Sequence, residues 1–500
     1  MDPRQCPFAL ALVALIALPS TALAAGFEVG EHTPRSLARG GTGVVNTADP
    51  STLYFNPARL PSVEGHQILG SVNIWDLDAT FQRDDFVYEP GAEPQSFELA
   101  ENQTGPFPIP FLAAAFDLGR DDLSAGVGIF TPPAFGNPCW GDGDDCEPGP
   151  LDATRGMVVE SDMAVVYFGG GIGKAFDLGS DRQLDIGLTA ALAYQFTDFS
   201  VAAEADIDVN PPWEEDPESE AFIRGQDLTG IAPTGILGIA YTDGPFRIAA
   251  SYRPPTKWNL EGEADVRWSK VLVEDLELDP ALSDDRISLE TWQAGTLRLG
   301  WGVVGGQHPR HADLPRWDLE FNTTWENWSM VDHFRLELFG GIEARAFPPD
   351  GDGNYETFNL NPIYQRKGYQ DAFSLRSGFS FAFNSLLTGH IGGALETAAQ
   401  PIAYTSADFL SWERYTASLG ATLDMTDNLR LDLAYAYIHS PDREVRNGEV
   451  YNPIPLSSCR GPDYRDGACQ TEGTPPGNPQ NEGLWTTRTQ VFGAGLNWRF

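Results

Sequence analysis

The sequence contains little lysine, histidine or cysteine. Among its 500 residues only 7 are histidine and 5 are cysteine. The lysines are Lys174, Lys257, Lys270 and Lys367. Lysine and arginine together number 32 against 71 aspartate and glutamate residues, which leaves a net charge of -39. A surface this acidic repels nucleic-acid phosphates and offers no polybasic patch to an anionic membrane surface. The composition therefore excludes nucleic acid as a partner.

The chain also lacks a long hydrophobic run, so no segment after the N-terminus is a candidate transmembrane helix. The N-terminus itself is built like a secretory signal peptide. It has Arg4 at its start, an apolar core at 8–18 and the small-residue cleavage site Ala22-Leu23-Ala24. That core is too short to cross a bilayer of about 30 Å as a helix. We therefore expect residues 1–24 to direct export and to be removed.

Four cysteines remain after Cys6 leaves with the signal. They form two local pairs, Cys139 with Cys146 and Cys459 with Cys469, each in a segment rich in glycine, proline and aspartate. In an oxidising compartment this spacing predicts two disulfides that staple loops. A metal site is disfavoured, because neither pair has the spacing of zinc ligands or a histidine close by.

From residue 67 onward, apolar and polar residues alternate in about fourteen segments, separated by turn-rich or acidic stretches. The segments are approximately 67–81, 107–118, 122–135, 157–177, 183–203, 228–243, 245–266, 286–304, 314–339, 365–384, 386–400, 413–425, 428–445 and 486–500. A soluble β-sandwich would show the same alternation. The number of segments, the aromatic residues near their ends and the C-terminal Phe500 favour a transmembrane barrel.

The connections between these segments alternate in length. Residues 177–182 and 241–246 make very short connections, whereas 82–106 and 446–485 are long. Membrane barrels place short turns on the periplasmic side and long loops outside. A barrel of about fourteen strands is too wide for its own side chains to fill, so its lumen is either an open channel or plugged.

Residues 26–60 precede the first strand and are too rich in glycine, threonine, aspartate and proline for a long helix or strand. This segment resembles the N-terminal plug, or hatch, of the outer-membrane long-chain fatty-acid transporter family (FadL/TodX/OmpP1 type). The resemblance rests on Ala25-Gly26-Phe27, on Leu37-Ala38-Arg39-Gly40 and, most specifically, on Asn56, Pro57 and Ala58. It implies an all-β fold, a transmembrane antiparallel β-barrel of about 14 strands with the plug inside its lumen.

The resemblance also divides the chain and implies a function. We expect a signal peptide at 1–24, a plug at 25–66 and the barrel at 67–500. Family members take up long-chain fatty acids or similar hydrophobic compounds passively across the Gram-negative outer membrane. External loops capture the substrate, an apolar pocket binds it, the plug rearranges, and the substrate leaves sideways through the barrel wall. Phe27 matches the family phenylalanine that reaches the pocket; alternatively it is an ordinary hydrophobic anchor.

In the family, a kink in the third strand opens the wall. The corresponding stretch here is LSAGVGIFTPPAFGNP, with Gly126, Gly128, Pro132 and Pro133. Proline cannot donate to a sheet ladder, so the proline pair would interrupt strand pairing where a lateral exit requires it. The alternative is that the strand simply ends at Phe130 and a loop begins.

A fatty-acid carboxylate needs a cationic partner, and arginine binds carboxylates through two hydrogen bonds. Strand parity places Arg253, Arg298 and Arg376 on the luminal face, which makes them candidate carboxylate partners. Alternatively, luminal arginines pair with luminal acids such as Asp318 and Glu320.

No cofactor, metal site or catalytic motif is expected. Residues 350–361 begin like a calcium-binding loop but lack its glycine and its final glutamate, and His308 and His311 fit a polar turn. Neither a GxSxG nor an HExxH motif occurs, so we do not expect an enzyme. The alternatives to the transporter are a general diffusion porin, an outer-membrane lipid hydrolase and an adhesin or assembly scaffold. The expected partners are hydrophobic small molecules and outer-membrane lipid, and a closed barrel needs no second copy to cover its edges.

Overall fold

The computed structural model describes residues 32–500 except 88–90, 121, 132–137, 142–145, 150, 205–217, 271–272, 275–276, 278, 312–313, 346–354, 360–361 and 452–478. Within these ranges, none of the helices has the length and apolar character required to cross a bilayer.

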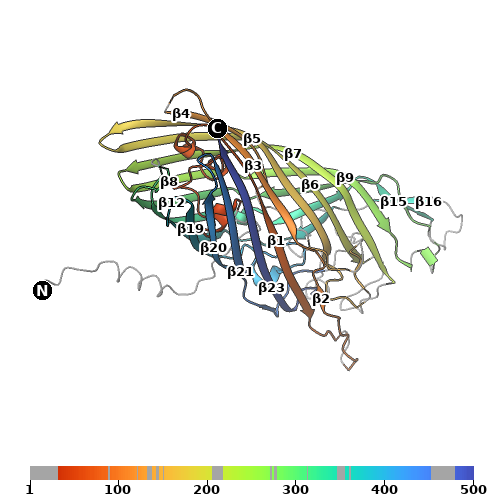
Figure 1. Cartoon of the computed structure of the whole chain (residues 1–500). Coiled ribbons are helices and arrows are strands. Elements are labelled where there is room, and N and C mark those ends of the chain that lie inside the picture. Colours follow the sequence, from red (N-terminus) through yellow and green to blue (C-terminus); the bar gives the residue numbers. More distant parts are fainter. Residues whose placement is uncertain are drawn as a thin grey trace.

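The molecule is an antiparallel β-barrel whose wall has 14 strands, as the alternating pattern predicts (Figure 1). The wall and its extensions form one sheet, which β1 and β23 close by pairing from Gln67↔Arg499 to Arg83↔Gly483. The elements of this sheet are β1 (Gln67–Arg83), β2 (Ala100–Glu101), β3 (Phe107–Asp117), β4 (Leu123–Phe130), β5 (Val158–Gly179), β6 (Arg182–Glu204), β7 (Glu220–Asp243), β8 (Phe246–Arg253), β9 (Thr256–Arg267), β11 (Arg286–Gln293), β12 (Thr296–Gly305), β13 (Trp317–Glu326), β14 (His333–Leu338), β17 (Ile363–Arg366), β18 (Ala372–Ala382), β19 (Leu387–Glu396), β20 (Arg414–Asp424), β21 (Leu429–His439), β22 (Arg443–Val445) and β23 (Gly483–Arg499).

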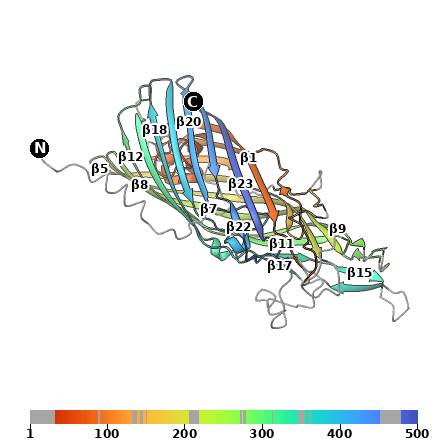
Figure 2. The same ribbon diagram turned by 90° about the horizontal axis from the view of Figure 1, so that it is seen from below.

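A second, smaller sheet contains β10 (Ala281–Leu282), β15 (Gly341–Arg345) and β16 (Tyr355–Asn359). Figures 1 and 2 show β15 beyond the end of the barrel that carries the long loops. We call this end the long-loop end. The opposite end, where 180–181 and 244–245 connect strands and where Phe500 lies, is the short-turn end.

Several expected strands are interrupted in the structure, which corrects the predicted bounds. The segment expected at 245–266 consists of β8 and β9, because Pro254 and Pro255 have no N–H group to donate to a ladder. The segment expected at 286–304 breaks at Ala294-Gly295, beside that proline pair, since a Cβ at Gly295 would lie 2.9 Å from Pro255 Cδ. The segments expected at 314–339, 365–384 and 428–445 are likewise split, into β13 and β14, β17 and β18, and β21 and β22. In the segments 245–266 and 286–304 the apolar residues keep the same parity across the break, so the alternation did not reveal it.

Apolar side chains project outward around the wall. Large exposed examples include Ile231, Leu237, Ile248, Leu419 and Trp498. A soluble sandwich would bury this face, whereas a bilayer solvates it. The arrangement excludes the soluble alternative.

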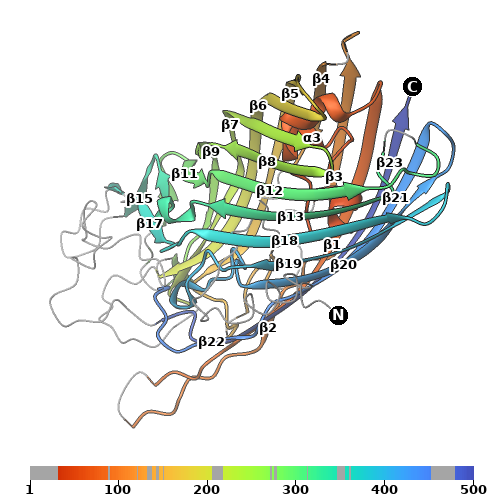
Figure 3. The same ribbon diagram turned by 90° about the vertical axis from the view of Figure 1, so that its left-hand side faces the viewer.

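The N-terminal segment, residues 32–66, lies inside the ring of strands (Figure 3). It contains α2 (Pro34–Leu37), α3 (Thr52–Phe55) and the 3-10 helix η1 (Pro57–Ser62). Its residues contact inward-facing glycines on strands around the ring. A Cβ added at Gly392 on β19 would lie 2.1 Å from Arg39, and one added at Gly187 on β6 would lie 2.2 Å from Pro57. The segment therefore occupies space that the wall leaves free with glycine.

Candidate functional site between the N-terminal segment and the barrel wall

The Asn56-Pro57-Ala58 motif is the point where the segment is tied to the wall. The Asn56 side chain is 0% exposed. Its Nδ2 donates to the carbonyl oxygens of Val44 at 3.1 Å and Ile239 at 3.3 Å, and its Oδ1 accepts from Ala58 N at 3.1 Å. The Asn56 amide thus links two parts of the N-terminal segment, joins this segment to β7 and caps η1.

Two glycines on neighbouring strands make room for this motif. Gly187 on β6 pairs with Gly238 on β7. A Cβ at Gly238 would lie 2.0 Å from Asn56 Oδ1. Real Cβ atoms do not approach other atoms so closely, so the backbone of the motif can reach the wall only over glycine.

A second tie is formed by Glu320 on β13, whose carboxylate is 0% exposed. Its oxygens accept hydrogen bonds from Val45 N at 2.9 Å, Asn46 N at 3.1 Å and Arg39 Nη2 at 3.2 Å. Arg39 also pairs with Asp318 at 2.5 Å. The luminal acids that were expected to neutralise wall arginines instead bind an arginine of the segment itself.

On the side of the segment that faces the long-loop end, aromatic rings gather around the last residue of β4. The ring centroid of Phe130 lies 5.8 Å from that of Tyr54, 5.6 Å from that of Phe111 and 5.8 Å from that of Tyr167. The four residues, which we call the aromatic cluster, are all buried. They belong to a larger buried apolar group that extends along the inner wall and includes Trp258, Trp328 and Phe409.

Arg298 on β12 lies against this aromatic cluster and is 7% exposed. Its Nη2 donates to the Tyr54 hydroxyl oxygen at 2.6 Å, and its guanidinium stands 4.7 Å from the centre of the Tyr54 ring. Its Nη1 has no hydrogen-bond partner, and among the described residues no carboxylate lies within ion-pair distance of it. A buried cation without a counter-ion is energetically costly, so an anion that reached Arg298 would be stabilised there.

The other two candidate arginines have different surroundings. Arg253 donates to Tyr167 Oη at 3.3 Å, to Ala294 O at 2.9 Å and to Thr296 Oγ1 at 3.0 Å, so it borders the aromatic cluster. Arg376 forms an ion pair with Glu396, which also binds Arg414 at 2.9 Å. The charge of Arg376 is therefore matched within the wall.

His32 completes this site, and sequence reasoning missed it. Its ring centre lies 3.8 Å from that of Tyr54 and 5.9 Å from that of Phe55. Burial, followed by the positive charge of Arg298, lowers the pKa of His32 well below its usual value, so the ring is neutral at neutral pH.

Strand pairing around β4 changes at Phe130. From Ser124 to Phe130, β4 is paired on both sides, with β3 and with β5. Gly126 and Gly128 lie within this paired part, and a Cβ at Gly126 would stand 3.1 Å from Leu53 of the segment. The strand ends at Phe130, and Pro132 and Pro133 lie outside the described residues.

Beyond Phe130, the described parts of β3 and β5 pair with their outer neighbours but not with each other. Residues 107–110 of β3 pair with β1, and 158–166 of β5 pair with β6. Two of those β3 residues, Pro108 and Pro110, have no N–H to offer to another strand. The prolines at alternate positions of β3 are a sequence signal for this interval. The strand prediction at 107–118 did not take them into account.

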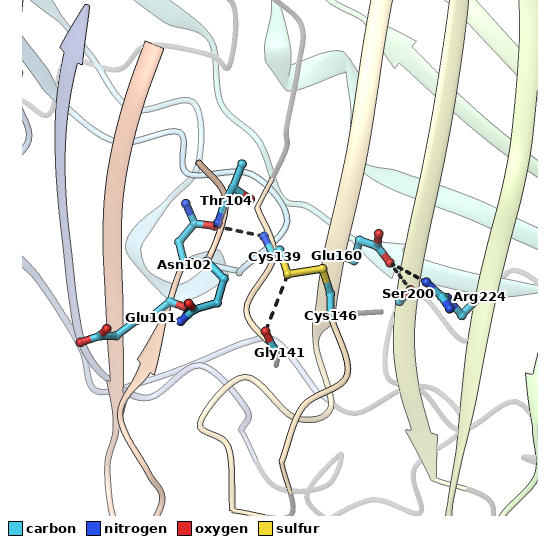
Figure 4. The surroundings of a disulfide bond; sticks show 10 residues. Glu101, Asn102, Thr104, Cys139, Gly141, Cys146, Glu160, Ser200 and Arg224 are labelled. Atoms are coloured by element: carbon cyan, nitrogen blue, oxygen red, sulfur yellow. Dashed lines mark hydrogen bonds and ion pairs between the residues drawn. A yellow bond between two sulfur atoms is a disulfide. The ribbon is translucent and has the colours of Figure 1, made fainter. Parts of the chain in front are cut away.

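The disulfide between Cys139 and Cys146 borders the same interval on its long-loop side (Figure 4). Cys139 N donates to Asn102 Oδ1 at 3.0 Å, Cys139 O accepts from Gln103 N at 2.6 Å, and Trp140 N donates to Val159 O at 3.0 Å. The segment around Cys139 thus connects Asn102 and Gln103, which follow β2, with Val159 on β5. Cys459, Cys469 and Phe27 lie outside the described residues.

His308, His311 and Asp424 meet at the short-turn end, where their possible ligand atoms all lie within 4.8 Å of one another. His311 Nε2 lies 2.8 Å from Asp424 Oδ1. His308 Nδ1 accepts hydrogen bonds from the N–H groups of Arg310 and His311, both at 3.2 Å, so its neutral ring carries the proton on Nε2. A metal ion at Nε2 would have to displace that proton, so the group fits the polar turn that the sequence predicts.

A polar cavity of about 320 Å³ lies on the short-turn side of the segment. Its lining includes Arg35, Arg59, Arg247, Asp49, Asp318 and Asp432. The segment therefore separates the polar cavity from the apolar inner wall. An acyl chain would meet charged side chains on one side of the segment and apolar side chains on the other.

These features define a class, an outer-membrane β-barrel whose lumen is occupied by its own N-terminal segment. The chain matches the outer membrane protein transport protein family (OMPP1/FadL/TodX) over residues 14–455 and belongs to that family. This confirms the resemblance that the sequence carries. The family transports hydrophobic compounds across the Gram-negative outer membrane, and this chain is such a transporter.

Solved structures agree in fold. A Pseudomonas aeruginosa FadL homologue superposes with a TM-score of 0.67 at 16% identity, covering 95% of this chain and 100% of that chain. The P. putida toluene transporter TodX gives 0.58 at 15% identity over 95% and 99% of the two chains. The Ralstonia pickettii toluene transporter TbuX gives 0.55 at 14% identity over 94% and 98%. No curated protein sequence matches the chain.

Proposed function

We propose that this protein takes up long-chain fatty acids, or amphiphiles with a similar anionic head group, across the outer membrane. The observation that carries the proposal is Arg298, a buried guanidinium that no described carboxylate neutralises, beside the aromatic cluster. A fatty-acid carboxylate would supply the counter-ion through a charge-assisted hydrogen bond. The acyl chain would lie along the buried apolar residues toward the long-loop end.

Release through the wall follows from the two environments that the segment separates. Passage along the barrel axis would carry an acyl chain into the charged cavity that Arg59, Arg247 and Asp318 line. The interval next to Phe130, where Pro108 and Pro110 cannot donate to a neighbour, would instead give the acyl chain a path toward lipid. In this mechanism the N-terminal segment acts as the plug and its rearrangement releases the substrate sideways. The protein would act as a monomer, because β1 and β23 close the ring and leave no strand edge for a second copy to cover.

The first test identifies the ligand. Lipids retained by the protein in mild detergent are identified by mass spectrometry, and we expect fatty acids. Arg298→Gln should reduce retained fatty acid at least about tenfold, because a charge-assisted bond is lost in a buried site. Arg430→Gln is the matched control, since Arg430 pairs with Asp424 at the short-turn end. Equal retention by the two variants would contradict the role of Arg298.

The second test examines the plug. Asn56→Ala removes both donors and the cap at the motif, so we expect fatty-acid uptake by cells to fall severalfold. Asn384→Ala is the control, because Asn384 caps an exposed turn through similar side-chain hydrogen bonds. Unchanged uptake in Asn56→Ala would remove the proposed role of the plug.

Neutral aromatic hydrocarbons are the second candidate substrate, favoured by the fold shared with two toluene transporters. Toluene offers no acceptor that could neutralise Arg298. A protein that binds toluene but not hexadecanoate would replace the first proposal with the second. A large, steady conductance in planar bilayers would instead favour a diffusion porin.

A further inference from the structure

The guanidinium proposed to receive the ligand head group is held by the plug itself. Tyr54 belongs to α3, one element before the Asn56 motif, whereas Arg298 belongs to the wall strand β12. Their 2.6 Å hydrogen bond therefore joins the segment to the wall. Any ligand group that binds Arg298 alters this connection.

The Tyr54 oxygen is a neutral acceptor, and a carboxylate is a stronger one. Arg298 is buried, its Nη1 has no hydrogen-bond partner, and within the described ranges it has no ion-pair partner. A carboxylate that reaches Nη1 gains the full interaction with an otherwise uncompensated charge. The guanidinium then moves toward the anion and away from the neutral hydroxyl.

We infer that an anionic head group displaces Tyr54 from Arg298 and thereby loosens the N-terminal segment, so that the Arg298–Tyr54 pair is a ligand sensor that responds to charge. The inference rests on the proposed function, because it assumes that the carboxylate binds at Arg298. A neutral ligand of the same chain length would lie along the same buried apolar residues but leave the Arg298–Tyr54 hydrogen bond intact. Tyr54 is thus a positioning residue that couples substrate class to plug release.

The remaining ties of the segment explain why breaking this one loosens the segment without unfolding it. Glu320 holds Arg39, Val45 and Asn46, and Asn56 holds the motif to β7. Asn46 and Asp318, the second acid that binds Arg39, line the polar cavity. The backbone of α3 is also joined to the wall, because Thr189 Oγ1 donates to Leu53 O at 2.8 Å and Ser251 Oγ donates to Phe55 O at 2.7 Å. Loss of the Tyr54 contact therefore weakens the attachment of α3 to the wall next to Phe130 without releasing it.

Accessibility of the segment provides the readout. Ala48 is a half-buried residue of the segment that lines the polar cavity, so Ala48→Cys offers a thiol to a water-soluble maleimide. The labelling rate is measured in detergent with hexadecanoate, with hexadecanol or with no addition. We expect hexadecanoate to raise the rate about threefold or more, and hexadecanol to leave it unchanged.

Two variants in the Ala48→Cys background test the pair. Tyr54→Phe keeps the ring but removes the acceptor, so we expect fast labelling without ligand, little further increase with hexadecanoate and tighter hexadecanoate binding. Arg298→Gln should abolish the response to hexadecanoate. Tyr435→Phe, which removes a hydroxyl bound to Gln490 on the wall, is the matched control and should behave like the parent.

The outcomes separate the two proposals. If hexadecanoate does not bind the parent protein, both the proposed function and the sensor are wrong. If it binds with unchanged affinity in Tyr54→Phe, or binds without changing the labelling rate, only the sensor is wrong. An equal effect of hexadecanol would also overturn it.

Discussion

Gly238 lies so close to Asn56 that a Cβ on the glycine would stand 2.0 Å from the Asn56 side-chain oxygen. The relationship joins a wall strand to a segment that precedes it by more than a hundred positions. It explains why the wall has a glycine here, in the middle of a long strand where glycine lowers stability.

Gly238→Ala should therefore displace the motif while leaving the wall intact. Overpacking of this kind costs about 1–3 kcal/mol, and here the segment moves more easily than the barrel. We expect higher conductance to small ions in planar bilayers together with lower fatty-acid uptake. Gly70→Ala is the control, because a Cβ there meets only Leu112 at 3.8 Å. Conductance equal to that of the wild type would show that the segment tolerates the methyl group.

Glu320→Gln tests the second tie of the segment. The amide keeps the shape of the side chain but replaces one acceptor oxygen with a donor that faces the N–H groups of Val45 and Asn46. Disruption of a buried ionic contact costs about 3–5 kcal/mol, part of which Asp318 recovers by binding Arg39. We expect a lower melting temperature and faster proteolysis within the segment.

Glu290→Gln is the matched control for this variant, because Glu290 pairs with Lys257 at 2.9 Å in a solvent-exposed position. Exposed pairs contribute about 0–1 kcal/mol, so its melting temperature should hardly change. A similar decrease in both variants would show that Glu320 has no special role in holding the segment.

The wall could be read from the sequence because its pattern is local. Side chains alternate with a period of two, so Phe492, Leu496 and Phe500 identify one face without knowledge of any other strand. The motif at Asn56 was recognisable because it is contiguous. The strand breaks at Pro254 and Ala294 were missed, since alternation continues across them.

The partners inside the barrel could not be read in the same way. Arg39 and Glu320 meet only because the segment folds into the ring, and the sequence offers many acids that satisfy an arginine equally well. For the same reason parity placed Arg298 and Arg376 on the same luminal face, although of these two arginines only Arg376 has an ion-pair partner among the described residues, Glu396. The difference that makes Arg298, and not Arg376, the proposed anion site is three-dimensional.

The Cys139–Cys146 disulfide should stabilise the Cys139 segment more than the barrel. It closes a short loop, for which chain entropy gives about 2.5 kcal/mol. In the double variant Cys139→Ser, Cys146→Ser, we expect faster proteolysis near Trp140 with an unchanged barrel melting temperature. Non-reducing peptide mapping of the wild type checks this bond and, in the same experiment, the predicted Cys459–Cys469 bond. A large decrease in barrel melting temperature would contradict the local role.

The last prediction concerns pH and His32. The usual pKa of histidine is about 6.5, and in the folded protein burial and Arg298 lower the pKa of His32 well below this value. Below about pH 6.5 the unfolded chain therefore binds a proton at this position that the folded chain does not, and the contribution of His32 to stability falls as pH decreases toward its folded pKa. We expect the melting temperature to fall between pH 7 and pH 5, and His32→Phe to fall less over the same interval. His439→Phe, on the exposed face of β21, should retain the wild-type slope. Equal slopes for His32→Phe and the wild type would show that His32 does not titrate between the folded and unfolded states in this range.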